Sequence, residues 1–243
     1  MSYLDNISQN ASVVNPREII VMAYPKIGKT ELCTMLPGSY VILDFERGTD
    51  FFKCNKISIN DVQTMSEVMK EFSEKKPHFD FIIFDTLTSF YNDLATPLSV
   101  MKYNADEKKK QPLTWDITNL AYGAGQRYLR ITTQEILKFF RKYCDTLILL
   151  GHVSDKTMGT TEGELNVKEL DIEGKLKNIL ALKTDAIALL SRKEANKNYL
   201  SFTPSTGLIG GTRVPHLANK EFLISEKLPD GTLKAYWDQI FIK

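Results

Sequence analysis

Short, almost continuous apolar runs recur along the chain and predict its strands. Each run has the length of a strand, and its residues are apolar in succession rather than in alternation with polar ones. Such runs are typical of strands that are buried on both faces of a parallel sheet. The runs span residues 19–22, 41–43, 79–84, 147–150 and 186–190.

Amphipathic stretches between the runs predict helices. Over residues 62–72 the apolar positions recur at helical spacing, and Asn60, with Gln63 three residues later, predicts the N-cap of this helix. A second helix is expected over residues 125–143. The alternation of strands and helices predicts an α/β fold in which helices flank a mostly parallel central sheet on both faces.

Other segments depart from this alternation. Residues 92–123 and 152–174 are polar and contain proline or glycine, so each is expected to be a long irregular segment of a kind that is often functional. The chain from Tyr199 onward carries glycine- and proline-containing turn signals between short apolar stretches. This last part predicts an antiparallel C-terminal extension of the sheet.

Composition indicates an ordinary globular protein. Of the 243 residues, 43% are hydrophobic and 25% are charged, and the net charge is +1. This balance carries no overall electrostatic signature of a nucleic-acid-binding protein, so such a partner would need a local basic patch. We expect an N-terminal segment over residues 1–16 and a single domain over residues 17–243.

The cysteines and the longest apolar runs bear on the cellular compartment. The chain has 3 cysteines and no CxxC pair, which argues against a disulfide framework and a zinc site and for a reducing compartment. The first residues do not have the pattern of a signal peptide, and no apolar run approaches the roughly 18 residues of a membrane span. We therefore expect a cytoplasmic protein with no membrane partner.

The segment that follows the first predicted strand carries the candidate nucleotide site. Its sequence AYPKIGKT, residues 23–30, matches the P-loop pattern G-x-x-x-x-G-K-[ST] except that Ala23 replaces the first glycine. In a P-loop, Gly28 lets backbone N–H groups approach the phosphates, Lys29 reaches the β- and γ-phosphates, and Thr30 is a ligand of Mg²⁺. The alternative is a strand–turn–helix with a chance Gly-Lys-Thr. The expected cofactors are ATP and Mg²⁺, and the expected nucleotide-binding residues are Ala23, Tyr24, Pro25, Lys26, Ile27, Gly28, Lys29 and Thr30.

The apolar run at residues 79–84 ends on Asp85, which predicts a second part of the same site. A carboxylate at the end of a buried strand is the Walker B arrangement, in which it holds the shell of the Mg²⁺ ion. The alternative is a strand-end aspartate that caps the following turn. Together with the P-loop, the pattern favours Thr30 and Asp85 as the residues around the metal.

Two more strand ends carry polar side chains. Asp44 and Glu46 follow the run at residues 41–43, and because they are two apart in an extended segment they point the same way. One of them could orient the attacking water as a general base. His152 follows the run at residues 147–150 and is a candidate sensor of the γ-phosphate that signals to the next loop. The alternatives are a solvated acidic turn and a histidine satisfied by a backbone carbonyl.

The order of these motifs resembles that of the RecA-like ATPase superfamily. The matching pieces are YPKIGKT, LDFERG, FIIFDTLTSF, AYGAGQRYLR, LILLGH and the Thr-Arg pair at residues 212–213, and they span about residues 17–225. The chain looks closest to phage-type RecA-like proteins of the AAA family, which are associated with single-strand annealing and recombination. The resemblance implies ATP hydrolysis with Glu46 as the catalytic base, in the host cytoplasm if the chain is phage-encoded.

The resemblance also implies single-stranded DNA as a partner, because the loops after the third and fourth strands of RecA-like proteins face DNA. These loops correspond to the two segments expected to be irregular. Lysines there would contact phosphates and aromatic side chains would stack on bases, the alternative being solvated charged loops. The candidates are Lys102, Lys108, Lys109, Lys110, Tyr103 and Trp115 in the first segment, and Lys156 and Lys168 in the second.

RecA-like proteins usually complete their site across a subunit interface, which implies a homo-oligomer, either a ring or a filament. The resemblance places Arg213 where related chains carry a basic residue that reaches the γ-phosphate of the neighbouring subunit. Lys220 is a second candidate, and the alternative is a surface arginine without such a role.

The sequence leaves two other functions open. A P-loop phosphotransferase acting on a small molecule would need an arginine-rich lid near the phosphates, and no such cluster is evident. A non-catalytic, nucleotide-gated binding protein would use ATP to order its loops with negligible turnover. DNA-stimulated hydrolysis, phosphate transfer to a metabolite, and tight binding without turnover distinguish the three.

Overall fold

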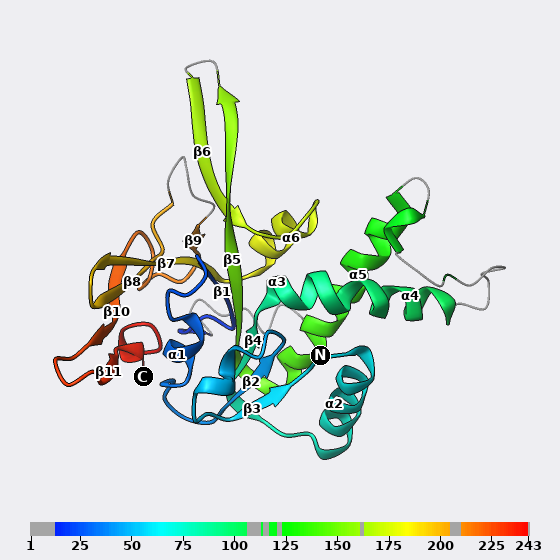
Figure 1. The fold of residues 1–243 in the computed structure, drawn as a ribbon, viewed down its shortest axis with the longest axis horizontal. Helices are drawn as coiled ribbons and strands as arrows, with labels where there is room; N and C mark the ends of the chain where they lie inside the picture. The colour runs from blue at the N-terminus through cyan, green and yellow to red at the C-terminus, as the bar shows by residue number, and fades with distance from the viewer. Residues whose placement is uncertain are drawn as a thin grey trace, which may run out of the picture.

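The computed structural model describes residues 13–105, 113, 117–120, 123–160, 163–204 and 210–242. These residues form an 11-stranded sheet whose main path has the order β11-β10-β8-β7-β1-β5-β4-β2-β3, with β6 paired to β5 and β9 paired to β7 (Figure 1). The central strand β1 lies between β5 and β7, and it runs parallel to both.

The parallel part of the sheet contains every apolar run that predicted a strand. Each run lies within one strand, and the pairs β1–β5, β1–β7, β2–β3, β2–β4 and β4–β5 are all parallel, as predicted. The carboxyl ends of these strands therefore meet at one edge of the sheet. The parallel strands are β1 Glu18–Ala23, β2 Tyr40–Asp44, β3 Lys56–Ser58, β4 Phe79–Asp85, β5 Cys144–Thr160 and β7 Ala186–Glu194.

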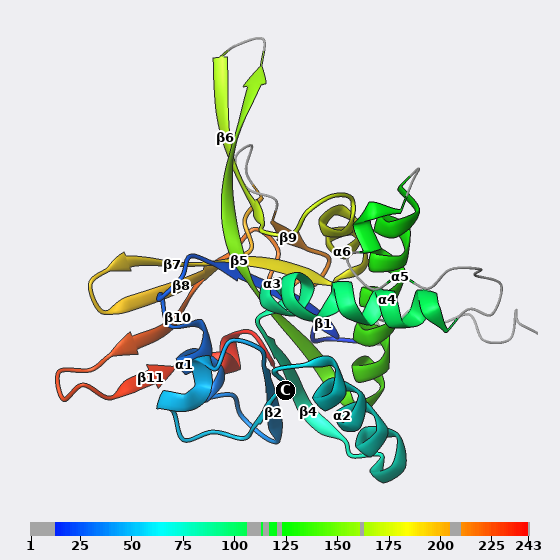
Figure 2. The ribbon, with the colours of Figure 1, turned by 45° about the vertical axis from the view of Figure 1, so that its right-hand side comes forward.

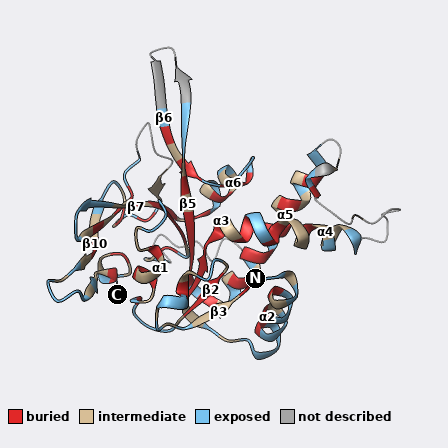
Figure 3. Cartoon of the chain, in the orientation of Figure 1, coloured by how far each residue is buried: buried red, intermediate tan, exposed pale blue. Residues whose placement is uncertain are grey.

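Both faces of this sheet are buried, which explains the continuous apolar runs. Along β1, Ile20 and Met22 pack into a hydrophobic cluster on one face, whereas Ile19 and Val21 pack into a second cluster on the other. The first cluster includes the apolar sides of α2 and α5, and the second includes those of α1 and the C-terminal segment around Trp237. Figures 2 and 3 show these layers and the buried strands between them.

The helices confirm the predicted α/β fold, although their ends differ from the prediction. The N-cap of α2 is Asp61, whose Oδ1 accepts a 2.7 Å hydrogen bond from the backbone N of Thr64, whereas Asn60 accepts from Arg47. The expected N-cap at Asn60 was therefore wrong by one residue, because Asn60 and the Asp61 that follows it are both residue types that favour N-caps. The helices are α1 Lys29–Cys33, α2 Val62–Lys75, α3 Leu87–Ser89, α4 Thr96–Asn104, α5 Ala124–Phe140 and α6 Leu176–Lys183.

The predicted antiparallel extension is confirmed. Strand β8 pairs antiparallel with β7 and with β10, and β10 pairs antiparallel with β11. The short strand β9 pairs with the beginning of β7. The extension consists of β8 Lys197–Ser201, β9 Gly211–Thr212, β10 Glu221–Lys227 and β11 Leu233–Ala235.

The described parts of the two segments expected to be irregular are largely regular, so the prediction was wrong there. Residues 92–123 include the whole of α4. In the second segment, β5 continues to Thr160 and pairs antiparallel with β6, Gly163–Leu170, to form a hairpin over residues 153–170. This β5–β6 hairpin projects beyond the edge of the sheet (Figure 1). Its sequence is mostly polar and has no continuous apolar run, so the hydrophobic pattern did not predict its strands.

The cysteines provide a test of the packing. Burial raises the pKa of all three thiols, that of Cys33 well above its usual range and that of Cys144 to about 11, but Cys54 is only half-buried and is the most accessible of the three. We expect Cys54 to react first with an aromatic disulfide reagent at pH 8, about 100-fold or more ahead of the other two, because thiolate fraction and access set the rate. Substitution of Cys54→Ser should remove the fast phase alone. Equal rates for all thiols in the native protein would contradict this packing.

None of the helices in the described part of the chain combines the length and the apolar character needed to cross a membrane.

Candidate functional site

The register of the parallel strands brings the predicted site residues together. Ala23 at the end of β1 lies beside His152 on β5, and Asp44 at the end of β2 lies beside Asp85 at the end of β4. Ligands of open α/β sheets bind outside the carboxyl ends of the strands. The P-loop, both acidic strand ends and the histidine therefore share one edge, as the sequence predicted.

The P-loop leaves β1 and turns sharply into α1. Gly28 has a φ of 99° and precedes α1, in a conformation that a residue with a side chain adopts only with strain. Lys26 also has a positive φ, 63°. Ala23, in contrast, is fully buried within β1 and has no positive φ, so this position of the motif does not require glycine here.

The side chains of Arg192, on β7, and Asn198, on β8, hold the P-loop. Arg192 Nη2 donates to the carbonyl oxygen of Ile27 at 3.2 Å, and Asn198 Nδ2 donates to the same oxygen at 3.4 Å. Arg192 Nε also donates to Asn198 Oδ1 at 3.1 Å. The two residues come from β7 and β8, more than 160 positions along the chain from Ile27 (|i−j| of 165 and 171), and no sequence motif pointed to them.

Lys29 is a buried cation with few partners. The residue is 6% exposed. Its Nζ lies 3.4 Å from the carbonyl oxygen of Tyr24 and 3.4 Å from Nδ1 of His152. Burial lowers the pKa of Lys29, and the nearby carboxylates of Glu46 and Asp85 partly offset this effect. Among the ion pairs of the described residues, none includes Lys29. A buried charge with so little compensation favours an anionic ligand such as a phosphate.

Thr30 and Asp85 form the second part of the site. The Thr30 hydroxyl donates to Asp85 Oδ2 at 2.6 Å, and burial raises the pKa of Asp85 to about 6 despite this hydrogen bond. Gly48 closes over the pair, since a Cβ at that position would lie 3.5 Å from Thr30 Oγ1 and 3.8 Å from Asp85 Oδ2. A hydroxyl and a carboxylate are hard oxygen donors, so this pair fits Mg²⁺ chemistry.

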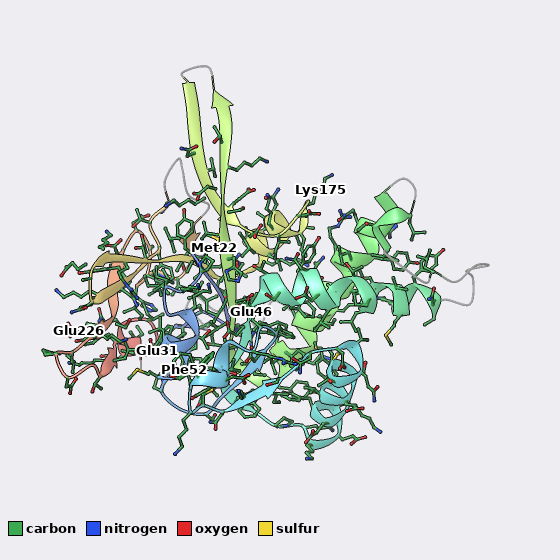
Figure 4. All side chains as sticks on the ribbon, viewed as in Figure 1. Met22, Glu31, Glu46, Phe52, Lys175 and Glu226 are labelled. Carbon is green, nitrogen blue, oxygen red and sulfur yellow. The ribbon has the colours of Figure 1, made fainter. Side chains whose placement is uncertain are left out.

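Three side chains of the site hold the carboxylate of Glu46. Its Oε1 lies 2.9 Å from His152 Nε2 and accepts hydrogen bonds from the hydroxyls of Ser89, at 2.6 Å, and Thr86. Burial alone would raise the pKa of Glu46, but the hydrogen bonds from His152, Ser89 and Thr86 outweigh it and lower the pKa to about 2. Glu46, labelled in Figure 4, is therefore a fixed, negatively charged group near the start of α3.

Asp44 has different surroundings from Glu46, which separates the two carboxylates that the strand-end pattern alone left equivalent. Asp44 is fully buried, and its oxygens accept hydrogen bonds from the backbone N–H groups of Glu46, Gly48 and Thr49 at 3.0, 3.2 and 3.1 Å. The Thr49 hydroxyl donates to it as well. Asp44 thus shapes the loop that carries Glu46, and Glu46 remains the candidate general base.

The ring of His152 bridges two of these groups. Its Nε2 faces Glu46 and its Nδ1 faces Lys29, while its backbone N donates to the Thr88 hydroxyl at 3.0 Å. The prediction that His152 lies at a strand end was wrong, because β5 continues past it to Thr160. The hydroxyls of Thr86, Thr88 and Ser89 around it were not predicted. Their signal is the hydroxyl-rich segment that follows Asp85 directly.

Arg213 lies away from this chain's own P-loop. It follows β9, which pairs with the first residues of β7, so it sits at the amino ends of the parallel strands. Its Nη2 donates to the carbonyl oxygens of Leu182 and Thr184 at 2.8 and 3.1 Å. A contact with a neighbouring subunit's nucleotide stays a prediction, as it does for the exposed Lys220.

The candidate DNA-contacting residues have mixed surroundings. Lys102 pairs with Glu135, and the Tyr103 ring packs edge-on against Tyr128 at 5.3 Å. On the β5–β6 hairpin Lys156 is exposed, whereas Lys168 lies over the ring of Tyr24. Lys108, Lys109, Lys110 and Trp115 lie outside the described residues.

Comparison with known proteins agrees with this geometry. A search among curated proteins found no match. A family model described as an AAA domain, AAA_24, matches residues 15–214, which include the P-loop, both acidic strand ends, His152 and Arg213. The chain therefore belongs to the AAA_24 family and contains an AAA-type P-loop ATPase domain.

Proposed function

We propose that this chain is a Mg²⁺-dependent ATPase that acts on single-stranded DNA in recombination, annealing or repair, and that it works as a homo-oligomer. Family membership supports nucleotide binding and ATPase activity in general. The observation that carries hydrolysis, rather than binding alone, is the Glu46 carboxylate held by His152, Ser89 and Thr86 at the edge that carries Lys29.

The P-loop supplies binding and charge. Lys29, already buried beside the P-loop backbone, would hold the phosphates together with the N–H groups around Gly28. Thr30 and Asp85 are the residues that would hold a Mg²⁺ ion, which when bound would help neutralise the phosphate charge. The raised pKa of Asp85 reflects a buried carboxyl group whose charged form a cation would stabilise.

Glu46 would orient the attacking water. A carboxylate whose pKa is about 2 is a weak proton acceptor, but phosphoryl transfer has a loose transition state that demands little of a base. Three hydrogen bonds hold the Glu46 carboxylate in one orientation, so it can hold a water in one position. The chemistry favours a positioning and electrostatic role over strong proton abstraction.

The β5–β6 hairpin supports the DNA part of the proposal. Strand β5 carries both His152, which touches Glu46 and Lys29, and the projecting hairpin with the exposed Lys156. A macromolecule bound to the hairpin would therefore be only a few residues from the phosphate-binding edge. Phosphate backbones are the ligands that exposed lysines contact without reading sequence.

We expect single-stranded DNA to stimulate ATP hydrolysis, with a rate per chain that rises with protein concentration because the site is completed by a neighbouring subunit. Stimulation should fade between about 50 and 200 mM salt, as counterion release requires. The measurement is phosphate release with and without DNA across a protein titration. Rates that are indifferent to DNA and linear in protein would remove DNA and assembly from the proposal while leaving the ATPase itself.

Substitution of Lys156→Ala sharpens this test. If the hairpin contacts the DNA backbone, the variant should need more DNA for half-maximal stimulation, and the dependence of binding on the logarithm of salt concentration should become shallower by about one unit. The rate without DNA should not change. Lys53→Ala, which removes another exposed lysine, is the matched control, and an unaltered salt dependence in Lys156→Ala would exclude this contact.

A further inference from the structure

Tyr24, the second residue of the P-loop, contacts both strands of the β5–β6 hairpin. Its hydroxyl donates to the carboxylate of Asp155 on β5, with distances of 2.8 Å to Oδ1 and 2.7 Å to Oδ2. The ammonium of Lys168 on β6 lies 5.1 Å from the centre of the Tyr24 ring. Asp155 and Lys168 are direct partners in the hairpin register, and we call this pair the Asp155–Lys168 rung. A single P-loop side chain therefore contacts both residues of one rung.

The base of the hairpin is firmly mounted on the rest of the protein. Leu170 packs so closely on Gly151 that a Cβ there would lie 2.2 Å from Leu170 Cδ1, and the backbone N of Asp171 donates to the carbonyl oxygen of His152 at 2.9 Å. Glu169 and Lys177 add an ion pair, largely shielded from solvent, between β6 and α6. Because these contacts fix the hairpin base, a movement of the base would displace Asp155 and Lys168 as well.

Tyr24 presents its backbone to the phosphate-binding lysine and its side chain to the hairpin. The carbonyl oxygen of Tyr24 is 3.4 Å from Lys29 Nζ, whereas the phenol lies on the Asp155–Lys168 rung. The hydroxyl and the ring use separate interactions, a charge-assisted hydrogen bond and a cation–π contact. The conformation of the P-loop and the position of the hairpin are thus tied through one residue.

We propose that Tyr24 is a positioning residue that links nucleotide binding at the P-loop to the β5–β6 hairpin. The link rests on the nucleotide-binding part of the proposed function and does not require that the hairpin binds DNA. Because linkage is reciprocal, a nucleotide that fixes the P-loop stabilises the hairpin base, and a ligand that fixes the hairpin base tightens nucleotide binding by the same factor. The route is separate from that of His152, a residue of β5 that contacts Glu46 directly.

Hydrogen exchange of the hairpin base, residues 153–157 and 166–170, tests the link. In the parent chain, Mg²⁺ with a non-hydrolysable ATP analogue should slow exchange there by about threefold or more, in keeping with the modest size of single-residue couplings. In Tyr24→Phe, which keeps the ring under Lys168 but removes the hydroxyl, the same ligand should slow exchange by less than about 1.5-fold. Asp155→Ala should behave like Tyr24→Phe, whereas Asp155→Asn, which keeps an acceptor, should retain part of the effect.

Tyr236→Phe is the matched control. Tyr236 makes the same two kinds of contact as Tyr24: its hydroxyl donates to Glu226, and Lys234 Nζ lies 4.8 Å from the centre of its ring. Tyr236, however, lies directly after β11 in the antiparallel extension. Its removal should leave the response of the hairpin at the parent level.

Analogue binding is measured on each preparation by a separate titration, and folding by thermal melting. If Tyr24→Phe is folded, binds the analogue and still shows the parent's protection, the link is overturned while the nucleotide site stands. If the parent itself does not bind the analogue, the proposed function and the link fail together.

Discussion

Substitution of Lys29→Ala should abolish nucleotide binding in practice. Within the described residues the buried ammonium of Lys29 makes two polar contacts, both 3.4 Å long, so most of its compensation is left to the phosphates. Loss of a charge-assisted contact of about 3 kcal/mol corresponds to at least about 100-fold weaker binding. Isothermal titration with ATP and Mg²⁺ measures the difference.

Lys53→Ala is the control for charge loss, since Lys53 is exposed and lies outside the P-loop. The affinity of Lys53→Ala for ATP should stay within about threefold of the parent's, because salt largely screens an exposed charge outside the phosphate-binding loop. Thermal melting should show that both variants fold. Equal ATP affinity in Lys29→Ala and the parent would remove the nucleotide site from this edge of the sheet.

Substitution of Glu46→Gln should separate binding from hydrolysis. Glutamine keeps the size of the side chain but loses the charge that His152, Ser89 and Thr86 stabilise, so the water-orienting group is lost without disturbing the P-loop. Groups of this kind contribute about 10²–10⁴-fold to the rate, so the turnover number should fall by at least about 100-fold. Affinity for ATP should change by less than about threefold, since Glu46 does not belong to the phosphate-binding loop.

The control for Glu46→Gln is Glu31→Gln. Glu31 lies in the first turn of α1, at the same edge of the sheet, but makes none of the contacts of the Glu46 cluster. Its turnover should remain close to that of the parent. A Glu46→Gln variant that hydrolyses ATP at the parent's rate would show that Glu46 is not the residue that positions the water.

Much of the site followed from the sequence because its parts are local. The P-loop, Asp85 and His152 each stand at the end of a continuous apolar run, and parallel strands bring such ends to one edge. The continuous apolar runs therefore predicted both the fold class and the neighbourhood of these residues. The same rule placed Asp44 and Glu46 together but could not say which carboxylate turns inward to the loop backbone.

What the sequence missed depends on contacts between distant segments or on solvated structure. Arg192 and Asn198 reach the Ile27 carbonyl only because antiparallel strands return beside the P-loop. The β5–β6 hairpin escaped notice because its sequence is mostly polar and lacks the continuous apolar run that marked the other strands. The contact of Tyr24 with Asp155 could not be predicted, because it depends both on the hairpin and on the position of the hairpin beside the P-loop.

The most direct test of the central claim is phosphate release from ATP by the purified parent chain, with an identically purified Lys29→Ala preparation as the blank. The site described here predicts release in the parent when Mg²⁺ is present and no release above background in Lys29→Ala. Equal release by both preparations would assign the activity to another site or another protein. ATP binding by the parent without release would contradict hydrolysis and leave a nucleotide-gated binding protein in its place.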